Sequence, residues 1–156
     1  MCKRILLILI IIISSFSLFS YPPGWEKVDV RPWEPSSYYL EIDCADSSNC
    51  MIWAEYWGAG GYYFRRTTDA GKTWENVYKD SAWINWNNGT QKFVPKIRGT
   101  AYPNEKLFIA VGDSGLLVRT TDKGESWESY RLDKKVRLFW LRMLDENYGI
   151  LFKIFV

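Results

Sequence analysis

The sequence contains one eight-residue pattern twice, as Thr67-Thr68-Asp69-Ala70-Gly71-Lys72-Thr73-Trp74 and as Thr120-Thr121-Asp122-Lys123-Gly124-Glu125-Ser126-Trp127. Both copies read [Ser/Thr]-x-Asp-x-Gly-x-[Ser/Thr]-Trp, and the two aspartates are 53 residues apart. Strand-like residues precede and follow each copy. A period of about 50 residues built from short strands predicts a repeated β-sheet unit, or blade.

The residue types of the pattern suit a tight turn between two strands. An aspartate side chain accepts hydrogen bonds from nearby backbone N–H groups, and a glycine two residues later adopts a positive φ without strain. The hydroxyl residues satisfy further backbone groups, and the tryptophan opens the next strand with a large apolar surface to bury. The pattern therefore predicts roles in folding and requires no substrate.

The two octapeptides resemble the Asp-box, or BNR repeat, of sialidases, sortilin-like receptors, xyloglucan-active glycosidases and photosystem II assembly-factor-like proteins. In those families the box lies between the third and fourth strands of a propeller blade, at the periphery and away from the active site. The resemblance implies an all-β fold, a partial β-propeller of roughly two and a half four-stranded antiparallel blades. It assigns a structural Asp-box role to Thr67, Asp69, Gly71, Thr73, Trp74, Thr120, Asp122, Gly124, Ser126 and Trp127.

The blades expected from this spacing span residues 37–80, 94–133 and 136–156, the last one incomplete. The expected strands are 39–43, 51–56, 62–67 and 74–78, then 96–101, 107–111, 116–120 and 127–132, then 138–144 and 150–156. The last range ends before a third Asp-box, and residues 24–28 resemble the close of one. We therefore expect part of a larger propeller, with open sheet edges that self-association would cover.

The segment between the first two blades, residues 82–89, is expected to be a polar loop. Asn88-Gly89 is a turn signal, and Asn88-Gly89-Thr90 is also a glycosylation sequon. The turn is the preferred interpretation of these residues.

Residues 1–20 are expected to be a signal peptide. A basic start precedes an unbroken apolar run, residues 5–13, and a serine-rich stretch follows, with cleavage expected after Ser17 or Ser20. The alternative is an uncleaved membrane anchor, but the apolar run is shorter than the roughly 20 residues of a spanning helix. The mature chain is then expected in a secreted, periplasmic or extracellular location, with no stable membrane span.

Composition excludes several classes of site. The chain has no His, which excludes a Ser-His-Asp triad, a Cys-His pair and every His-ligated metal site. Removing residues 1–20 takes away Lys3 and Arg4 and leaves 18 basic and 18 acidic residues. No electrostatic argument for nucleic-acid binding remains, and no cofactor is expected.

Two cysteines remain in the mature chain, Cys44 and Cys50, on either side of a turn-like stretch. An even pair in a chain bound for an oxidising compartment predicts a disulfide that joins two paired strands. A redox or metal-binding role is the alternative. Two cysteines without histidine make a poor metal site, so no metal is expected.

Candidate ligand-binding residues come from the expected inner strands of the blades. Aligning those strands places Glu41, Arg98 and Arg142 at comparable positions, which in a propeller line the central channel. Sialidases bind the sialate carboxylate with three arginines, because a guanidinium matches a carboxylate bidentately. Ion-paired strand arginines are the alternative interpretation.

No residue is assigned a catalytic role. Glycoside hydrolysis needs two carboxylates that flank the scissile bond, and no pattern singles out such a pair. The tyrosine nucleophile of sialidases, with its glutamate partner, matches no residue of this chain. Four tryptophans are candidates for stacking on sugars, with packing in the blade core as the alternative: Trp53, Trp57, Trp83 and Trp86.

The sequence as a whole favours a secreted, non-catalytic Asp-box β-propeller protein with an interaction or scaffolding role, similar to photosystem II assembly-factor-like proteins. Two alternatives stay open: an incomplete part of a sialidase-like glycosidase, and a carbohydrate-binding module. If the chain is an enzyme, glycoside hydrolysis is the expected activity. The expected partner is a protein or a carbohydrate that the sequence does not identify.

Overall fold

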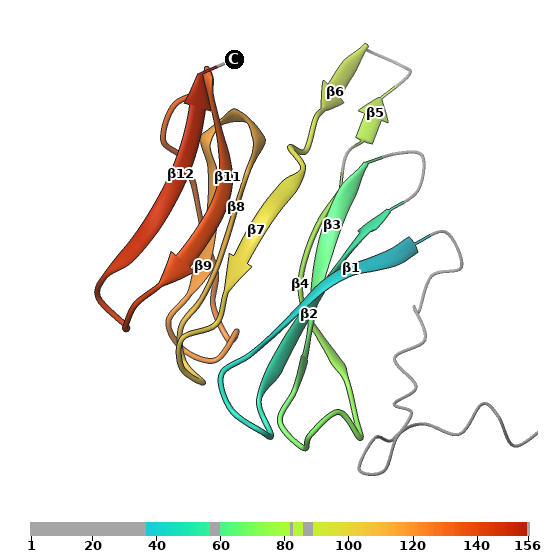
Figure 1. Ribbon diagram of the computed structural model, residues 1–156. Coiled ribbons are helices and arrows are strands. Elements are labelled where there is room, and N and C mark those ends of the chain that lie inside the picture. Colours follow the sequence, from blue (N-terminus) through green and yellow to red (C-terminus); the bar gives the residue numbers. More distant parts are fainter. Residues whose placement is uncertain (1–36, 57–59, 82, 86–88, 156) are drawn as a thin grey trace, which may run out of the picture.

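The computed structural model describes residues 37–56, 60–81, 83–85 and 89–155. In this part of the chain all regular elements are strands, apart from one short 3-10 turn. The first four strands form an antiparallel sheet in chain order: β1 (Ser37–Cys44), β2 (Cys50–Tyr56), β3 (Gly61–Thr67) and β4 (Glu75–Ser81). β1 therefore lies at one edge of this first sheet and β4 lies at the other (Figure 1).

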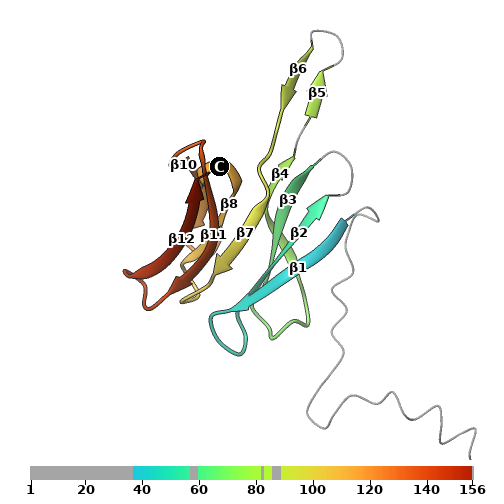
Figure 2. The ribbon, with the colours of Figure 1, turned by 45° about the horizontal axis from the view of Figure 1, so that its top comes forward.

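A second antiparallel sheet repeats this order, with β7 (Ile97–Ala101), β8 (Phe108–Gly112), β9 (Leu116–Thr120) and β10 (Glu128–Arg131). Two further strands, β11 (Val136–Met143) and β12 (Gly149–Phe155), form a hairpin beside it. β1 and β7 begin the two four-stranded sheets and β11 begins the hairpin; these three are called the inner strands below. β7 contacts both β1 and β11 and lies between them in both views (Figures 1 and 2).

The strands lie where the sequence predicts them, with ends that differ by a few residues. The expected polar loop at 82–89 was wrong, because β5 (Trp83–Asn85) lies within it and pairs with β6 (Thr90–Lys92). Backbone pairing across a turn at Gly89, where φ is +69°, overrides the polar composition there. Asn88 lies outside the described residues, and so do residues 1–36, with the expected signal peptide and residues 24–28.

The second sheet contributes to two separate cores, one on each face. Phe108 and Ala110 of β8 pack toward the first sheet, whereas Ile109 and Val111 pack toward β11. This alternation follows from the strand geometry, in which successive side chains point to opposite faces. The second sheet is therefore the middle layer of three.

The core between the first two sheets contains several aromatic rings. The ring of Phe64 in β3 lies 5.1 Å from Phe108, edge to face, and 5.1 Å from Trp127, stacked. Tyr78 in β4 also packs on Trp127, with ring centroids 4.9 Å apart. Aromatic pairs of this kind add stability beyond the apolar area that they bury. Trp127 therefore joins the second octapeptide to the first sheet.

Each inner strand contains a β-bulge. The pairing register shifts between Tyr39 and Glu41 in β1, between Ile97 and Gly99 in β7, and between Leu138 and Trp140 in β11. The extra residues at the three bulges are therefore Leu40, Arg98 and Phe139. A bulge adds one residue to one strand and redirects the side chains around it. Counted from the bulges, Glu41 corresponds to Gly99 and Trp140.

Cys44 and Cys50 form the predicted disulfide. They lie directly opposite each other at the end of the β1–β2 pair. The loop between them is ordered by Asp46, whose carboxylate accepts hydrogen bonds from the N–H groups of Ser48 (2.7 Å) and Asn49 (2.8 Å). These bonds hold the pKa of Asp46 below its usual value. The covalent link therefore closes a loop that hydrogen bonds already hold in one conformation.

Candidate functional site

An open groove of about 410 Å³ is lined by residues of all three inner strands. β1 contributes Glu41 and Asp43, β7 contributes Thr100, and β11 contributes Trp140 and Arg142. Two carboxylates, a hydroxyl, an indole and a guanidinium therefore line one space. Strand alternation explains part of the set, because residues two apart in β1 point to the same face.

The acidic side of the groove is held by hydrogen bonds from two neighbouring strands. The Thr100 hydroxyl donates to Asp43 Oδ2 and also lies 3.3 Å from Glu41 Oε2. The indole Nε1 of Trp53, in β2, donates to the same Glu41 oxygen at 3.4 Å. Because a hydroxyl has one proton, Thr100 serves one carboxylate at a time. The carboxylates keep free acceptor positions for a ligand with N–H donors.

The opposite side of the groove comes from β11. The Trp140 side chain is 48% exposed and packs with Phe152 of β12, with ring centroids 5.4 Å apart. Arg142 is exposed and follows two residues later on the same strand. The groove therefore has acidic groups on one strand, and a cation with an aromatic surface on another.

Of the three predicted ligand-binding residues, the structure brings Glu41 and Arg142 to the groove and leaves Arg98 outside it. Arg98 forms a bidentate ion pair with Asp113, with nitrogen–oxygen distances of 3.1 and 2.8 Å. Arg137 Nε lies 2.7 Å from the same carboxylate. Arg98 is thus the ion-paired strand arginine of the alternative interpretation. The predicted alignment of the inner strands was wrong because Arg98 occupies the bulge of β7.

The tryptophans proposed as sugar platforms do not form one surface in the described structure. Trp53 is only 6% exposed and lies in the core between the first two sheets. Trp57 and Trp86 lie outside the described residues, and the structure describes no side chain for Trp83. The exposed indole at the groove is instead Trp140, which the sequence analysis did not single out.

The two octapeptides form hydrogen-bonded turns after β3 and β9. The Asp69 carboxylate accepts from the Thr73 N–H (2.9 Å), the Thr73 hydroxyl (2.6 Å) and the Thr67 hydroxyl (2.8 Å). The Thr67 oxygen in turn accepts from the Gly71 N–H at 2.9 Å. Trp74 Nε1 donates to the Gly71 carbonyl at 3.0 Å. This side-chain network fixes the turn from within.

The second turn repeats the first bond by bond. Asp122 accepts from the Ser126 N–H at 2.9 Å and from the Thr120 hydroxyl at 2.7 Å. The Thr120 oxygen accepts from the Gly124 N–H at 2.8 Å, and Trp127 Nε1 donates to the Gly124 carbonyl at 3.0 Å. The two copies of the octapeptide therefore form turns with the same hydrogen bonds.

Hydrogen bonds to the two turn aspartates favour their ionised forms. The hydroxyl of Thr73, then its N–H, hold the pKa of Asp69 down at about 2, against an ordinary value of 3.8. The hydroxyl and N–H of Ser126 lower the pKa of Asp122 to about 2 in the same way. Both carboxylates are therefore structural acceptors and unsuited to donating a proton near neutral pH.

Sequence reasoning missed the residue before each turn glycine. Ala70 and Lys123 have positive φ values of 60° and 65°, although neither is glycine. Gly71 and Gly124, which follow them, have φ values of 85° and 88°. The backbone is therefore left-handed at two successive positions in each turn. No sequence signal marks this, because the position accepts both Ala and Lys.

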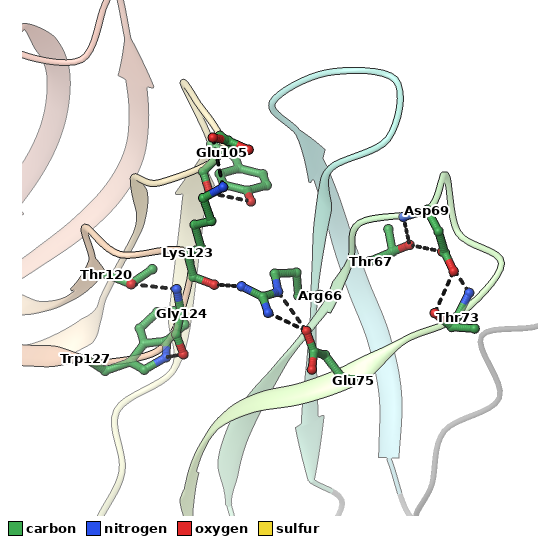
Figure 3. Close-up of polar contacts among 11 residues, drawn as sticks. Arg66, Thr67, Asp69, Thr73, Glu75, Glu105, Thr120, Lys123, Gly124 and Trp127 are labelled. Atoms are coloured by element: carbon green, nitrogen blue, oxygen red, sulfur yellow. Dashed lines mark hydrogen bonds and ion pairs between the residues drawn. The ribbon is translucent and has the colours of Figure 1, made fainter.

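The second turn makes a polar contact with the first sheet. The Arg66 guanidinium, at the end of β3, donates a hydrogen bond to the Lys123 carbonyl (Figure 3). The Arg66 Nε also donates to Glu75 Oε1 at 2.9 Å, which orients the guanidinium. The ammonium of Lys123 pairs with Glu105 at 2.9 Å. Arg66 therefore links the two sheets, which is a structural role.

The described residues contain neither a metal-binding cluster nor a helix that could span a membrane. Within residues 37–56, 60–81, 83–85 and 89–155, no group of three or more His, Cys, Asp or Glu side chains could hold a metal ion. No helix in those ranges has the length and apolarity to cross a membrane.

Comparison with known proteins identifies the fold. No protein-family model matches the sequence, and no curated protein matches it significantly. Among solved structures, the chain is similar to YCF48 from Cyanidioschyzon merolae, with 18% identity and a TM-score of 0.51, over 86% of this chain and 41% of that one. It is also similar to a structure titled YCF48 bound to D1 peptide, with 19% identity and a TM-score of 0.50, over 81% of this chain and 40% of that one.

These similarities concern the fold. YCF48 is a β-propeller, and the chain spans about two fifths of the length of both structures. The stacked four-stranded antiparallel sheets described above are consistent with that architecture. The chain therefore has the fold of a partial β-propeller.

Proposed function

We propose that this chain is a secreted, non-catalytic Asp-box β-propeller protein with an interaction role, and that its groove binds an extended polypeptide segment. The observation that carries the proposal is the placement of Glu41, Asp43, Trp140 and Arg142 around one open groove between the inner strands. Secretion is supported by the Cys44–Cys50 disulfide, which persists in oxidising compartments.

The chemistry of the groove suits a polypeptide ligand. The carboxylates of Glu41 and Asp43 favour a Lys or Arg side chain, and the Arg142 guanidinium favours an Asp, a Glu or a terminal carboxylate. The exposed Trp140 ring adds an apolar surface, of the kind enriched in binding sites. The similar structure whose title reads YCF48 bound to D1 peptide supports peptide binding in this fold.

The Asp-box assignment rests on the two turns. Each aspartate binds the backbone and the hydroxyl of the residue four positions later, and each tryptophan closes the turn through its indole nitrogen. These bonds involve side chains at the positions that define the octapeptide. The turns support an interaction protein in which the boxes stabilise the blades and the groove supplies the binding site.

A peptide-library selection tests the proposed function. The full chain, expressed with secretion so that Cys44 and Cys50 oxidise, is presented with a random-peptide library. We expect enrichment of peptides with a basic residue, and at least tenfold weaker binding of a selected peptide to the double variant Glu41→Gln/Asp43→Asn. Glu125→Gln, an exposed carboxylate in the second turn, is the matched control and should bind like the parent.

Two results would contradict the proposed function. Equal binding by the groove variant and the control would place the peptide elsewhere. Retention on a glycan array without peptide enrichment would favour a carbohydrate-binding module, and release of a chromogenic sialoside would favour a glycosidase.

A further inference from the structure

The contact between the first two sheets defines how an octapeptide turn docks on a sheet. In the second turn, the Lys123 carbonyl accepts from Arg66, which Glu75 orients. Gly124 lies against Val77, so closely that a Cβ there would be 3.3 Å from the valine Cβ. Trp127 stacks on Phe64. The turn thus contacts the sheet in three ways. Its carbonyl binds a cation, its glycine packs on an aliphatic side chain, and its tryptophan packs on an aromatic ring.

The second sheet repeats the arginine and an aromatic ring on its far side. It has no equivalent of Val77, which is the extra residue of a bulge in β4. Arg119 corresponds to Arg66 and pairs with Glu128 at 2.7 Å, as Arg66 pairs with Glu75. Tyr130 corresponds to Tyr78, because Tyr130 pairs with Leu117 as Tyr78 pairs with Phe64. The Arg119 guanidinium carbon lies 5.7 Å from the centre of the Tyr130 ring. Each pair therefore occupies the equivalent position in its own sheet.

The two equivalent arginines differ in exposure. The Arg66 side chain, which contacts the second turn, is 17% exposed, whereas the Arg119 side chain is 43% exposed. Tyr130 is 41% exposed, whereas the equivalent Tyr78 packs against the core and on Trp127 of the second turn. In the described part of the chain, no turn covers Arg119 and Tyr130 as the second turn covers Arg66 and Tyr78.

The strand equivalent to β8, which pairs with the hairpin of the second turn, is β12. Among the described residues, β12 pairs with β11 alone, and all seven residues of β12 are exposed. The first two sheets each add a third and a fourth strand at the corresponding edge. β12 therefore offers unpaired backbone groups. Its exposed apolar residues Leu151 and Phe155 pair with Leu141 and Val136, which pack toward the second sheet.

We propose that the β12 edge, together with Arg119 and Tyr130, is a docking surface for a separate β-hairpin with a [Ser/Thr]-x-Asp-x-Gly-x-[Ser/Thr]-Trp turn. The first strand of the hairpin pairs with β12. The carbonyl before the turn glycine accepts a hydrogen bond from Arg119. The tryptophan packs on Leu117 and Tyr130, which correspond to Phe64 and Tyr78. The two such hairpins in the described residues are already paired in four-stranded sheets, so neither is the occupant. This surface is distinct from the groove.

The chain's own first hairpin provides a probe. A labelled peptide of residues 61–81, which covers β3, the turn and β4, is titrated with the full chain and followed by fluorescence anisotropy. We expect saturable 1:1 binding that Arg119→Glu weakens at least tenfold. The matched control is Arg131→Glu, an exposed arginine of β10 that pairs with Leu116 and so faces the first sheet. It should leave binding within about twofold of the parent.

A second peptide tests the role of the turn. A peptide with Asp69→Ala and Thr73→Ala loses the bonds that fix the turn and should bind at least tenfold more weakly. Equal binding by Arg119→Glu and Arg131→Glu, or equal binding of the two peptides, would overturn the proposal. A dimer of the chain through β12 that the peptide does not displace would also overturn it and would make a second copy the occupant.

Discussion

Arg66 donates a hydrogen bond to the main-chain carbonyl of Lys123 and so joins β3 of the first sheet to the turn of the second. The equivalent residue in the second sheet, Arg119, also pairs with a glutamate on the next strand, but its side chain is far more exposed. The pair provides an internal comparison between an arginine that bridges two sheets and one in a surface ion pair.

Arg66→Ala should destabilise the protein more than Arg119→Ala does. Loss of its charge-assisted hydrogen bond to the Lys123 carbonyl should lower the free energy of unfolding by about 1.5–3 kcal/mol. Loss of the exposed Arg119–Glu128 pair should cost about 0.2–1 kcal/mol. Urea unfolding followed by tryptophan fluorescence measures both, and equal losses would contradict a bridging role for Arg66.

Acid should destabilise the turns between about pH 4 and pH 2. The pKa of Asp69 and of Asp122 is about 2 in the folded chain and 3.8 without these contacts, so folding favours the carboxylate form. The stabilisation is fully present above the unfolded pKa and is lost as the pH falls toward the folded pKa. Asp122→Asn should flatten the fall in urea midpoint over this range. A variant with an unchanged pH profile would exclude this aspartate as a source of the acid sensitivity.

Gly124→Ala should be more destabilising than Gly89→Ala. Both glycines have positive φ, so both substitutions introduce backbone strain of about 1 kcal/mol. At Gly124 the new Cβ also meets Val77 at 3.3 Å, whereas nothing lies within 4 Å at Gly89. Thermal unfolding of the two variants measures the difference, and Val77→Ala should relieve part of the loss at Gly124. Similar losses in both variants would show that the sheet contact contributes nothing.

Reduction of the disulfide should lower stability modestly. The Cys44–Cys50 bond closes a short loop, for which the chain-entropy model gives about 2 kcal/mol. A reductant should therefore shift the urea midpoint of the parent and leave that of the Cys44→Ser/Cys50→Ser variant unchanged. A reductant-sensitive variant would show that the effect has another source.

The strands and turns of the fold could be predicted from the sequence because the octapeptides mark the ends of β3 and β9. The groove could be predicted only in part. Glu41 and Arg142 were identified, but Asp43, Thr100 and Trp140 were not, because the inner strands carry bulges that leave no sequence signal. The bulge in β7 shifts the pairing register by one residue at Arg98, which lies outside the groove and pairs with Asp113.

The central claim, that the groove between the inner strands binds a polypeptide, is tested most directly by the tryptophan indole N–H signals in a nuclear magnetic resonance titration. A peptide selected by the chain should shift the signal of Trp140, which lines the groove, and of Trp53, which donates to Glu41. The signals of Trp74 and Trp127, which close the two turns, should stay in place. Shifts at Trp74 or Trp127 with an unmoved Trp140 would contradict the claim.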